Sequence, residues 1–183
     1  SITTGVQNTL VGGLAGDALT DADYNTGFGY LALSADTLGS NSTAIGTFAL
    51  TNQNFTTATD SHNTAVGYNA GGNTTTGVQN TFLGSLAGDA ITTGFANVAI
   101  GFQALSSDDV GLAGDALTDA DFNTVLGYAA LTSDTLGSSS VAIGRHALLS
   151  QNFTTATNTY NTAVGASAGQ SLTTAEQSTF VGG

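Results

Sequence analysis

A short phrase recurs ten times along this chain of 183 residues and constrains its fold more than any other feature. The phrase has a polar residue, usually Thr, which is Val in two copies, then a variable residue, a bulky aliphatic residue or Phe, a Gly, two free positions and, in every complete copy, an Ala. Thr43-Ala44-Ile45-Gly46, followed by Ala49, is one example. The motif glycines lie at positions 12, 29, 46, 67, 84, 101, 127, 144, 165 and 182, and six of their nine steps are equal, at 17 positions. Such a period predicts stacked structural units, each in contact with its neighbours.

Three steps depart from this common length. Two steps of 21 fit a four-residue insertion, and they contain the loops 53–59 and 151–157, which have the same sequence. The step of 26 contains a degenerate copy in which Val110 replaces the motif glycine while Ala113 keeps the alanine place. We interpret that copy as a partial unit or a bulge that interrupts the stack.

A longer repeat lies above the short one. Residues 13–72 and 111–170 are near-duplicates at an offset of 98 positions. The chain also opens and closes in mid-pattern. We therefore interpret residues 1–183 as one repetitive segment and a window of a longer fibre.

The residue types around each motif favour short strands. Segments such as 42–50 are rich in β-branched residues and end in turn formers, whereas runs with the helical period of 3.6 residues are missing. Disorder is the alternative for a polar, Gly-rich chain, but it gives no reason to keep an aliphatic residue in phase. We expect an all-β fold, a parallel β-solenoid (β-roll) of about ten to eleven rungs with the common step as their length, forming a rod about 50 Å long at the spacing of paired strands.

The motif also predicts where each side chain lies. The aliphatic residue before each Gly is expected to form the internal apolar ladder, as Val11, Phe28, Ile45 and their equivalents. The Gly fits a positive φ angle or a close backbone approach, and the Ala fits a crowded contact. The polar residue before each motif, such as Asn25, is expected to cap a turn or to form a side-chain ladder.

Composition limits the partners. One Arg, no Lys and 13 acidic residues give a net charge of −12, which disfavours nucleic acids and anionic membranes. No apolar run approaches the length of a membrane helix. Because a thin rung buries little apolar surface, we expect self-association, with three chains packed side by side to bury the alanine faces and part of the aromatic set, which includes Phe82, Tyr30 and Tyr128.

The phrases Asn63-Thr64-Ala65-Val66-Gly67-Tyr68-Asn69-Ala70 and 140–147 resemble the repeats of trimeric autotransporter adhesin heads and of bacteriophage tail-fibre shafts. The resemblance extends over essentially the whole chain at the level of the short motif. It implies a left-handed parallel β-roll, three chains per fibre and a location outside the cell or on a virion. Adhesin-head repeats are usually shorter than the repeat of this chain, and no anchor or coiled-coil stalk is present here, which favours the tail-fibre or free surface-fibre variants over a bacterial adhesin head.

Candidate chemistry is sparse. His62 and His146 are the only histidines, far apart in the sequence, and no Ser/His/Asp set or phosphate loop stands out. The acidic runs are the exception, because oxygen-rich loops can hold calcium (Ca²⁺), although their spacing matches neither an EF-hand nor a calcium-binding nonapeptide repeat. The weak calcium candidates are Asp17, Asp21, Asp23, Asp115, Asp119 and Asp121, and solvated acidic turns are the other interpretation. We expect no catalytic residue and no cofactor.

The sequence therefore predicts a structural or adhesive extracellular fibre that spaces or presents a binding tip, at a virion or cell surface. Loops around Phe55 and Phe153 are candidate contacts for a cell-surface glycan or receptor. One alternative is an extracellular filament of chains joined end to end. Another is a solenoid whose Thr-rich face binds ice or glycan, although the Thr-Thr pairs, such as 56–57 and 154–155, fall mostly in turns rather than at one strand position.

Overall fold

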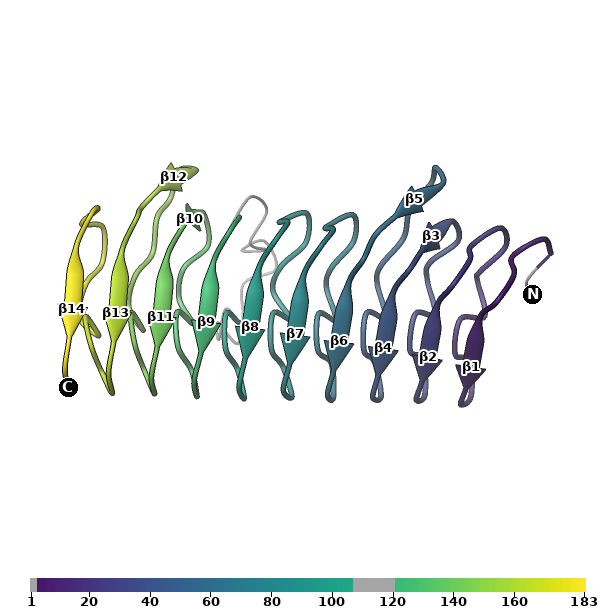
Figure 1. Ribbon diagram of the computed structural model, residues 1–183, viewed down its shortest axis with the longest axis horizontal. Helices are drawn as coiled ribbons and strands as arrows, with labels where there is room; N and C mark the ends of the chain where they lie inside the picture. Colours follow the sequence, from purple (N-terminus) through teal and green to yellow (C-terminus); the bar gives the residue numbers. More distant parts are fainter. Residues whose placement is uncertain (1–2, 107–120) are drawn as a thin grey trace.

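A computed structural model describes residues 3–106 and 121–183, and all the regular structure within these ranges is β. One sheet contains ten strands: β1 (Thr9–Val11), β2 (Thr26–Phe28), β4 (Thr43–Ile45), β6 (Thr64–Val66), β7 (Thr81–Leu83), β8 (Val98–Ile100), β9 (Thr124–Leu126), β11 (Val141–Ile143), β13 (Thr162–Val164) and β14 (Thr179–Val181). Two small sheets pair β3 (Gly39–Ser40) with β5 (Thr59–Asp60) and β10 (Gly137–Ser138) with β12 (Thr157–Asn158). The ten strands stand side by side along a rod (Figure 1).

All strand pairs are parallel and in register, so equivalent residues of successive motifs are stacked. Thr26 of β2 pairs with Thr9 of β1 and with Thr43 of β4. Backbone hydrogen bonds continue beyond the strands, as where the Gly46 N–H donates to the Phe28 carbonyl at 2.7 Å. The predicted parallel β-solenoid, in which the motif step sets the length of a rung, is therefore confirmed. A rung means here one circuit of the chain.

The two steps of intermediate length behave as insertions at one corner of the rod. Each contributes one strand, β5 or β12, which pairs with β3 or β10 of the preceding rung, and both small sheets project from the same side of the stack (Figure 1). Across the longest step, β8 pairs directly with β9, so the large sheet has ten strands and is not interrupted there. Val110 and Ala113 lie outside the described residues.

The ten strands of the large sheet are three residues long, shorter than the roughly five residues that are usual for a strand. The cause is the number of left-handed backbone positions in each rung. In the third rung these are Asn41 (φ 63°), Phe48 (φ 63°) and Leu50 (φ 48°). Each such residue turns the chain and ends extended structure, which leaves room for one short strand per rung.

The core lies on the other side of the strand from the predicted one. The middle residue of each strand points inward, and Ala44, Ala99 and Val125 are fully buried there. The residue before the motif glycine points outward, and Phe28 is 56% exposed. The prediction that this aliphatic column forms the internal ladder is therefore wrong. The alternation of a strand places neighbouring residues on opposite faces, and the pattern alone does not say which face is inside.

The motif alanines are part of that core. Ala32, Ala49 and Ala70 are fully buried within the single chain, which confirms the crowded position. They are not available to bury surface between chains, so this part of the predicted trimer contact is wrong.

Core volume is shared between two positions, within a rung or between neighbouring rungs. In the rungs of Ala44 and Ala99 the residue four places after the motif glycine is Leu, namely Leu50 and Leu105, whereas the small pairs Ala65/Gly71 and Ala163/Gly169 precede a rung with Phe82 or Phe180 in the middle of its strand. Around the larger Phe82 that position is Gly71 in the preceding rung and Gly88 in its own rung, and a Cβ at Gly71 would lie 2.6 Å from the Phe82 ring. Phe82 is consequently fully buried inside one chain, although the sequence suggested that such a core is too narrow for it.

The motif glycines form a column along one edge of the sheet. Gly67 has φ of +140°, and a Cβ there would lie 2.5 Å from the carbonyl oxygen of Gly84 in the next rung. Both reasons predicted for this glycine, a positive φ and a close backbone approach, are confirmed.

The polar position before the motif forms a buried ladder. The Asn80 backbone N–H donates to Asn63 Oδ1 at 2.9 Å, and the Asn97 N–H donates to Asn80 Oδ1 at 3.0 Å. Asn80 Nδ2 also donates to the Gly94 carbonyl at 2.8 Å. Each Asn thereby binds backbone beyond its own strand and in the neighbouring rung, so the predicted side-chain ladder is confirmed.

Candidate functional site

The most prominent surface is the outward side of the ten-stranded sheet, which we call the outer face. It consists of the first and third residues of each strand, stacked in two columns by the pairing register. The first column is Thr except for two Val residues: Thr9, Thr26, Thr43, Thr64, Thr81, Val98, Thr124, Val141, Thr162 and Thr179. The second column is apolar throughout: Val11, Phe28, Ile45, Val66, Leu83, Ile100, Leu126, Ile143, Val164 and Val181. No charged residue lies in the ten strands.

An aromatic corner adjoins the outer face, in the turn that follows the motif glycines. It contains Tyr30, Phe48, Tyr68, Phe102 and Tyr128. The ring centroids of Tyr30 and Phe48 are 5.8 Å apart with an edge-to-face angle of 73°, whereas Phe102 and Tyr128 stack at 5.6 Å and 15°. The rings therefore pack against one another along the rod. The two positions after each motif glycine contain no acidic residue.

The inserted loops are held by a buried polar network that occurs twice. Asp36 accepts hydrogen bonds from the Gly39 N–H at 3.0 Å, the Phe55 N–H at 3.2 Å and Gln53 Nε2 at 2.6 Å. Gln53 also donates to Ser42 Oγ and accepts from Asn63 Nδ2, which connects successive rungs. The sequence did not single out this network. Its only signal was a pair of acids at the same offset of 98 as the loops.

The second copy places Asp134 in the same role. It accepts from Gln151 Nε2 at 2.5 Å, from the Gly137 N–H at 3.1 Å and from the Phe153 N–H at 3.3 Å. Burial raises the pKa of the Asp134 carboxyl above its ordinary value of 3.8, and the hydrogen bond from Gln151 partly offsets this.

Phe55 and Phe153 are anchors of these loops, since each is only 5% exposed. The rings themselves are therefore not available to a glycan or a receptor, and the contact expected from the sequence remains a prediction for the loops around them. The Thr-Thr-Ala run that follows each Phe, 56–58 and 154–156, is exposed.

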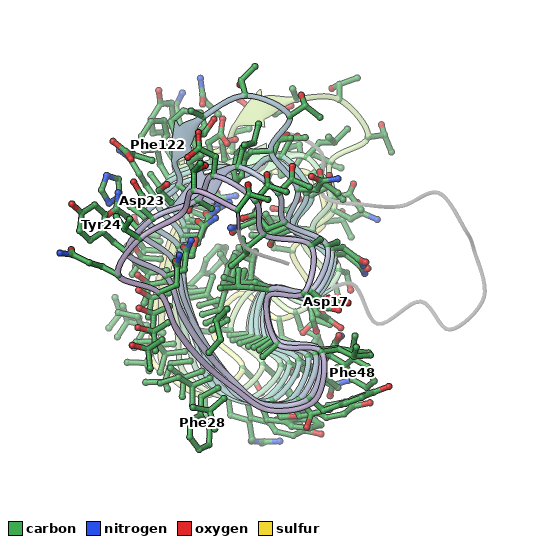
Figure 2. The ribbon with its side chains drawn as sticks, turned by 90° about the vertical axis from the view of Figure 1, so that its right-hand side faces the viewer. Asp17, Asp23, Tyr24, Phe28, Phe48 and Phe122 are labelled. Carbon is green, nitrogen blue, oxygen red and sulfur yellow. The ribbon has the colours of Figure 1, made fainter. Side chains whose placement is uncertain are left out.

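The acidic candidates for calcium are distributed around the rod. Asp23 Oδ1 accepts from the Val6 N–H at 2.7 Å, and its copy Asp121 accepts from the Phe95 N–H at 2.9 Å. Asp21 accepts from Thr4 Oγ1 at 2.6 Å. Asp17 lies across the rod from Asp23, which sits beside Tyr24 (Figure 2). The bonds of Asp21, Asp23 and Asp121 join one rung to the next.

No group of three metal-ligating side chains is close enough to hold an ion within residues 3–106 and 121–183. Asp115 and Asp119 lie outside these ranges. The two histidines are on different rungs, and His62 is exposed in the fourth rung. The ring centroids of His146 and Tyr128 are 5.6 Å apart, and His146 Nδ1 lies 3.4 Å from a guanidinium nitrogen of Arg145.

A hollow at the end of the stack is lined by Ala168, Thr179 and Phe180, and none of the sequence candidates lies in it. In the described part of the chain, no helix is long and apolar enough to span a membrane. Comparisons with protein-family models, with curated proteins and with solved structures found no match.

Proposed function

We propose that this chain is a shaft segment of an extracellular structural fibre, without catalytic activity, in which three copies associate side by side through their outer faces. The observation that carries the proposal is the uncharged apolar surface along the full length of a rod whose net charge is −12. Large exposed apolar surfaces of this kind mark interaction sites. Copies of an acidic chain can approach each other where charge is missing.

The size of the outer face supports a contact that includes more than the sheet. Ten strands at about 4.8 Å and three residues per strand give an area of about 450 Å². A stable interface needs about 800 Å² per partner. The aromatic corner is the adjoining surface and contains no acidic residue, with Arg145 at the equivalent turn position of one rung, so it completes the required area.

Two adjoining surfaces on one rod favour a closed ring of parallel chains. In such a ring the outer face of one copy meets the aromatic corner of the next, which makes a heterologous contact that closes after three copies. Parallel packing keeps equivalent rungs of the three chains at the same height. The resemblance of the repeats to tail-fibre shafts and adhesin heads also points to three chains per fibre. The inserted loops would then face outward, where 56–58 and 154–156 are available to a cell-surface ligand such as a glycan.

Light scattering on the purified chain tests the proposal. We expect a particle of three times the chain mass of 18.1 kDa. The triple variant Phe28→Ser, Leu83→Ser, Leu126→Ser should have the mass of a single chain. The matched control Tyr24→Asn, Phe122→Asn, Tyr160→Asn removes residues of similar exposure and should keep the assembly. Tyr24 and Phe122 lie near Asp23, away from Phe28 (Figure 2). A single-chain mass for the unaltered protein at 0.15 M NaCl and 100 µM would contradict it.

An ice-binding face is a second candidate, because the structure removes the reason given against it. Eight Thr residues do occupy one repeated strand position, in register along the outer face. Thermal hysteresis measured on the same samples separates the two functions. We expect no hysteresis, because the outer face is covered in the trimer; hysteresis together with a single-chain mass would favour ice binding. Continuous filaments in electron micrographs, instead of separate rods, would favour end-to-end joining.

A further inference from the structure

The charges of this chain are segregated from its outer face. Asp17, Asp21, Asp60 and Glu176 are exposed, and none of them belongs to the ten-stranded sheet. Asp17 lies across the rod from Asp23, and both lie away from Phe28 of the outer face (Figure 2). Apart from Arg145 at the aromatic corner, the surface of contact is therefore uncharged, while each copy brings its whole net charge of −12 close to the next.

Added salt can only strengthen the association of such a pair of chains, because it screens their repulsion. In most proteins, salt weakens ion pairs between copies as well as repulsion. Here Arg145 is the only Lys or Arg in the sequence, so attraction between unlike charges is almost lacking. The screening length is about 30 Å at 0.01 M salt and about 8 Å at 0.15 M, whereas packed sheets are separated by about 10 Å. At low salt the full charges of two neighbours repel, and at 0.15 M most of that repulsion is screened.

We infer that lateral association of this chain is gated by ionic strength, with folded single chains at low salt and assembled fibres at higher salt. The inference rests on the proposed fibre and concerns the regulation of its outer face. Repulsion depends on the product of the two net charges, so it is sensitive to a few surface acids that never touch the interface.

The test measures mass by sedimentation equilibrium in 10, 50, 150 and 500 mM NaCl at pH 7, with circular dichroism at each point to follow folding. We expect the dissociation constant of the unaltered chain to fall about tenfold or more between 10 and 150 mM. The variant Asp17→Asn, Asp21→Asn, Asp60→Asn, Glu176→Gln removes four of the 12 net charges and leaves −8. The product of the net charges of two copies falls from 144 to 64, which is less than half. The change in the logarithm of the dissociation constant between 10 and 150 mM NaCl should therefore be less than half of that of the unaltered chain. Asn158 already stands at the position equivalent to Asp60.

The matched control exchanges the same acids with charge retained (Asp17→Glu, Asp21→Glu, Asp60→Glu, Glu176→Asp) and should behave like the unaltered chain. Equal association at 10 and 150 mM NaCl would overturn the gating and leave the fibre proposal standing. A single chain at every salt concentration would overturn both. Loss of the β signal at 10 mM would also overturn the gating, which requires a folded single chain.

Discussion

The exchange of bulk between Phe82 and its neighbouring glycines gives a prediction whose magnitude can be worked out from the packing. Phe82 is fully buried, and a Phe→Ala change at such a site costs about 3–5 kcal/mol. In a chain of 183 residues a loss of about 4 kcal/mol lowers Tm by about 8–16 °C. Gly88→Leu alone should also destabilise, by about 1–3 kcal/mol or more, because a side chain at Gly88 would clash with the Phe82 ring.

The double variant Phe82→Ala, Gly88→Leu should recover most of this loss. It recreates the Ala44/Leu50 and Ala99/Leu105 arrangements, in which Leu adopts a left-handed φ of 48° and 53°, close to the 61° of Gly88. We expect a net loss below about 2 kcal/mol, and therefore a favourable coupling energy of about 3 kcal/mol or more, within the upper range for contacting residues. Urea denaturation of all four proteins at one protein concentration and in one salt buffer measures it. Additive effects would refute the exchange of core volume.

Three further changes test the glycine column, the Asn ladder and the buried carboxylate. Gly67→Ala forces a Cβ against the Gly84 carbonyl at φ +140° and should cost about 3 kcal/mol or more, whereas Gly13→Ala, without a positive φ, should stay within about 0.5 kcal/mol in thermal melts. Asn80→Ala leaves the Asn97 N–H and the Gly94 carbonyl without their Asn80 partner and should cost about 2–4 kcal/mol; a cost no larger than that of the neighbouring change Gln79→Ala would exclude the ladder as a stabilising element. Burial raises the Asp134 pKa, so the folded state binds that proton more tightly than the unfolded chain. Its contribution to the free energy of unfolding therefore increases as the pH falls through the folded pKa toward 3.8. Melts of the unaltered chain and of Asp134→Asn at pH 7 and pH 4.5 should show the unaltered chain gaining relative to the variant at pH 4.5, and an unchanged or opposite difference would contradict the assignment.

The repeat spacing was sufficient to predict the solenoid, because a constant step with a fixed Gly and Ala leaves few ways to stack. It could not decide which side of a three-residue strand is inside. Ala44 and Ile45 are adjacent, and hydrophobicity alone assigns the larger Ile45 to the core. The left-handed Phe48 and Leu50 bring Leu50 into the interior, and this fills the space that a small Ala44 leaves. Left-handed backbone at Phe48 and Leu50 could not be predicted from the residue types, since Leu is uncommon at positive φ.

The outer face was missed for the same reason. Thr43 and Ile45 lie on the same face of their strand. Assigning Ile45 to the core therefore places Thr43 inside as well, and an exposed column of Thr residues is then not expected from the sequence. The buried network at Asp36 was also not predictable, because it needs Gln53 from an inserted loop to return beside the preceding rung.

Thiol accessibility at Leu83 tests the central claim most directly, since the natural chain has no cysteine. In a Leu83→Cys variant we expect the thiol to be protected at 150 mM NaCl and high protein concentration, and to react at the rate of a free thiol when dilution gives single chains. A Tyr160→Cys variant should react at the same rate in both conditions. A Leu83→Cys thiol that reacts equally fast at every concentration would show that no copy covers the outer face. A thiol protected even in the single chain would show that the aliphatic column lies inside the solenoid after all.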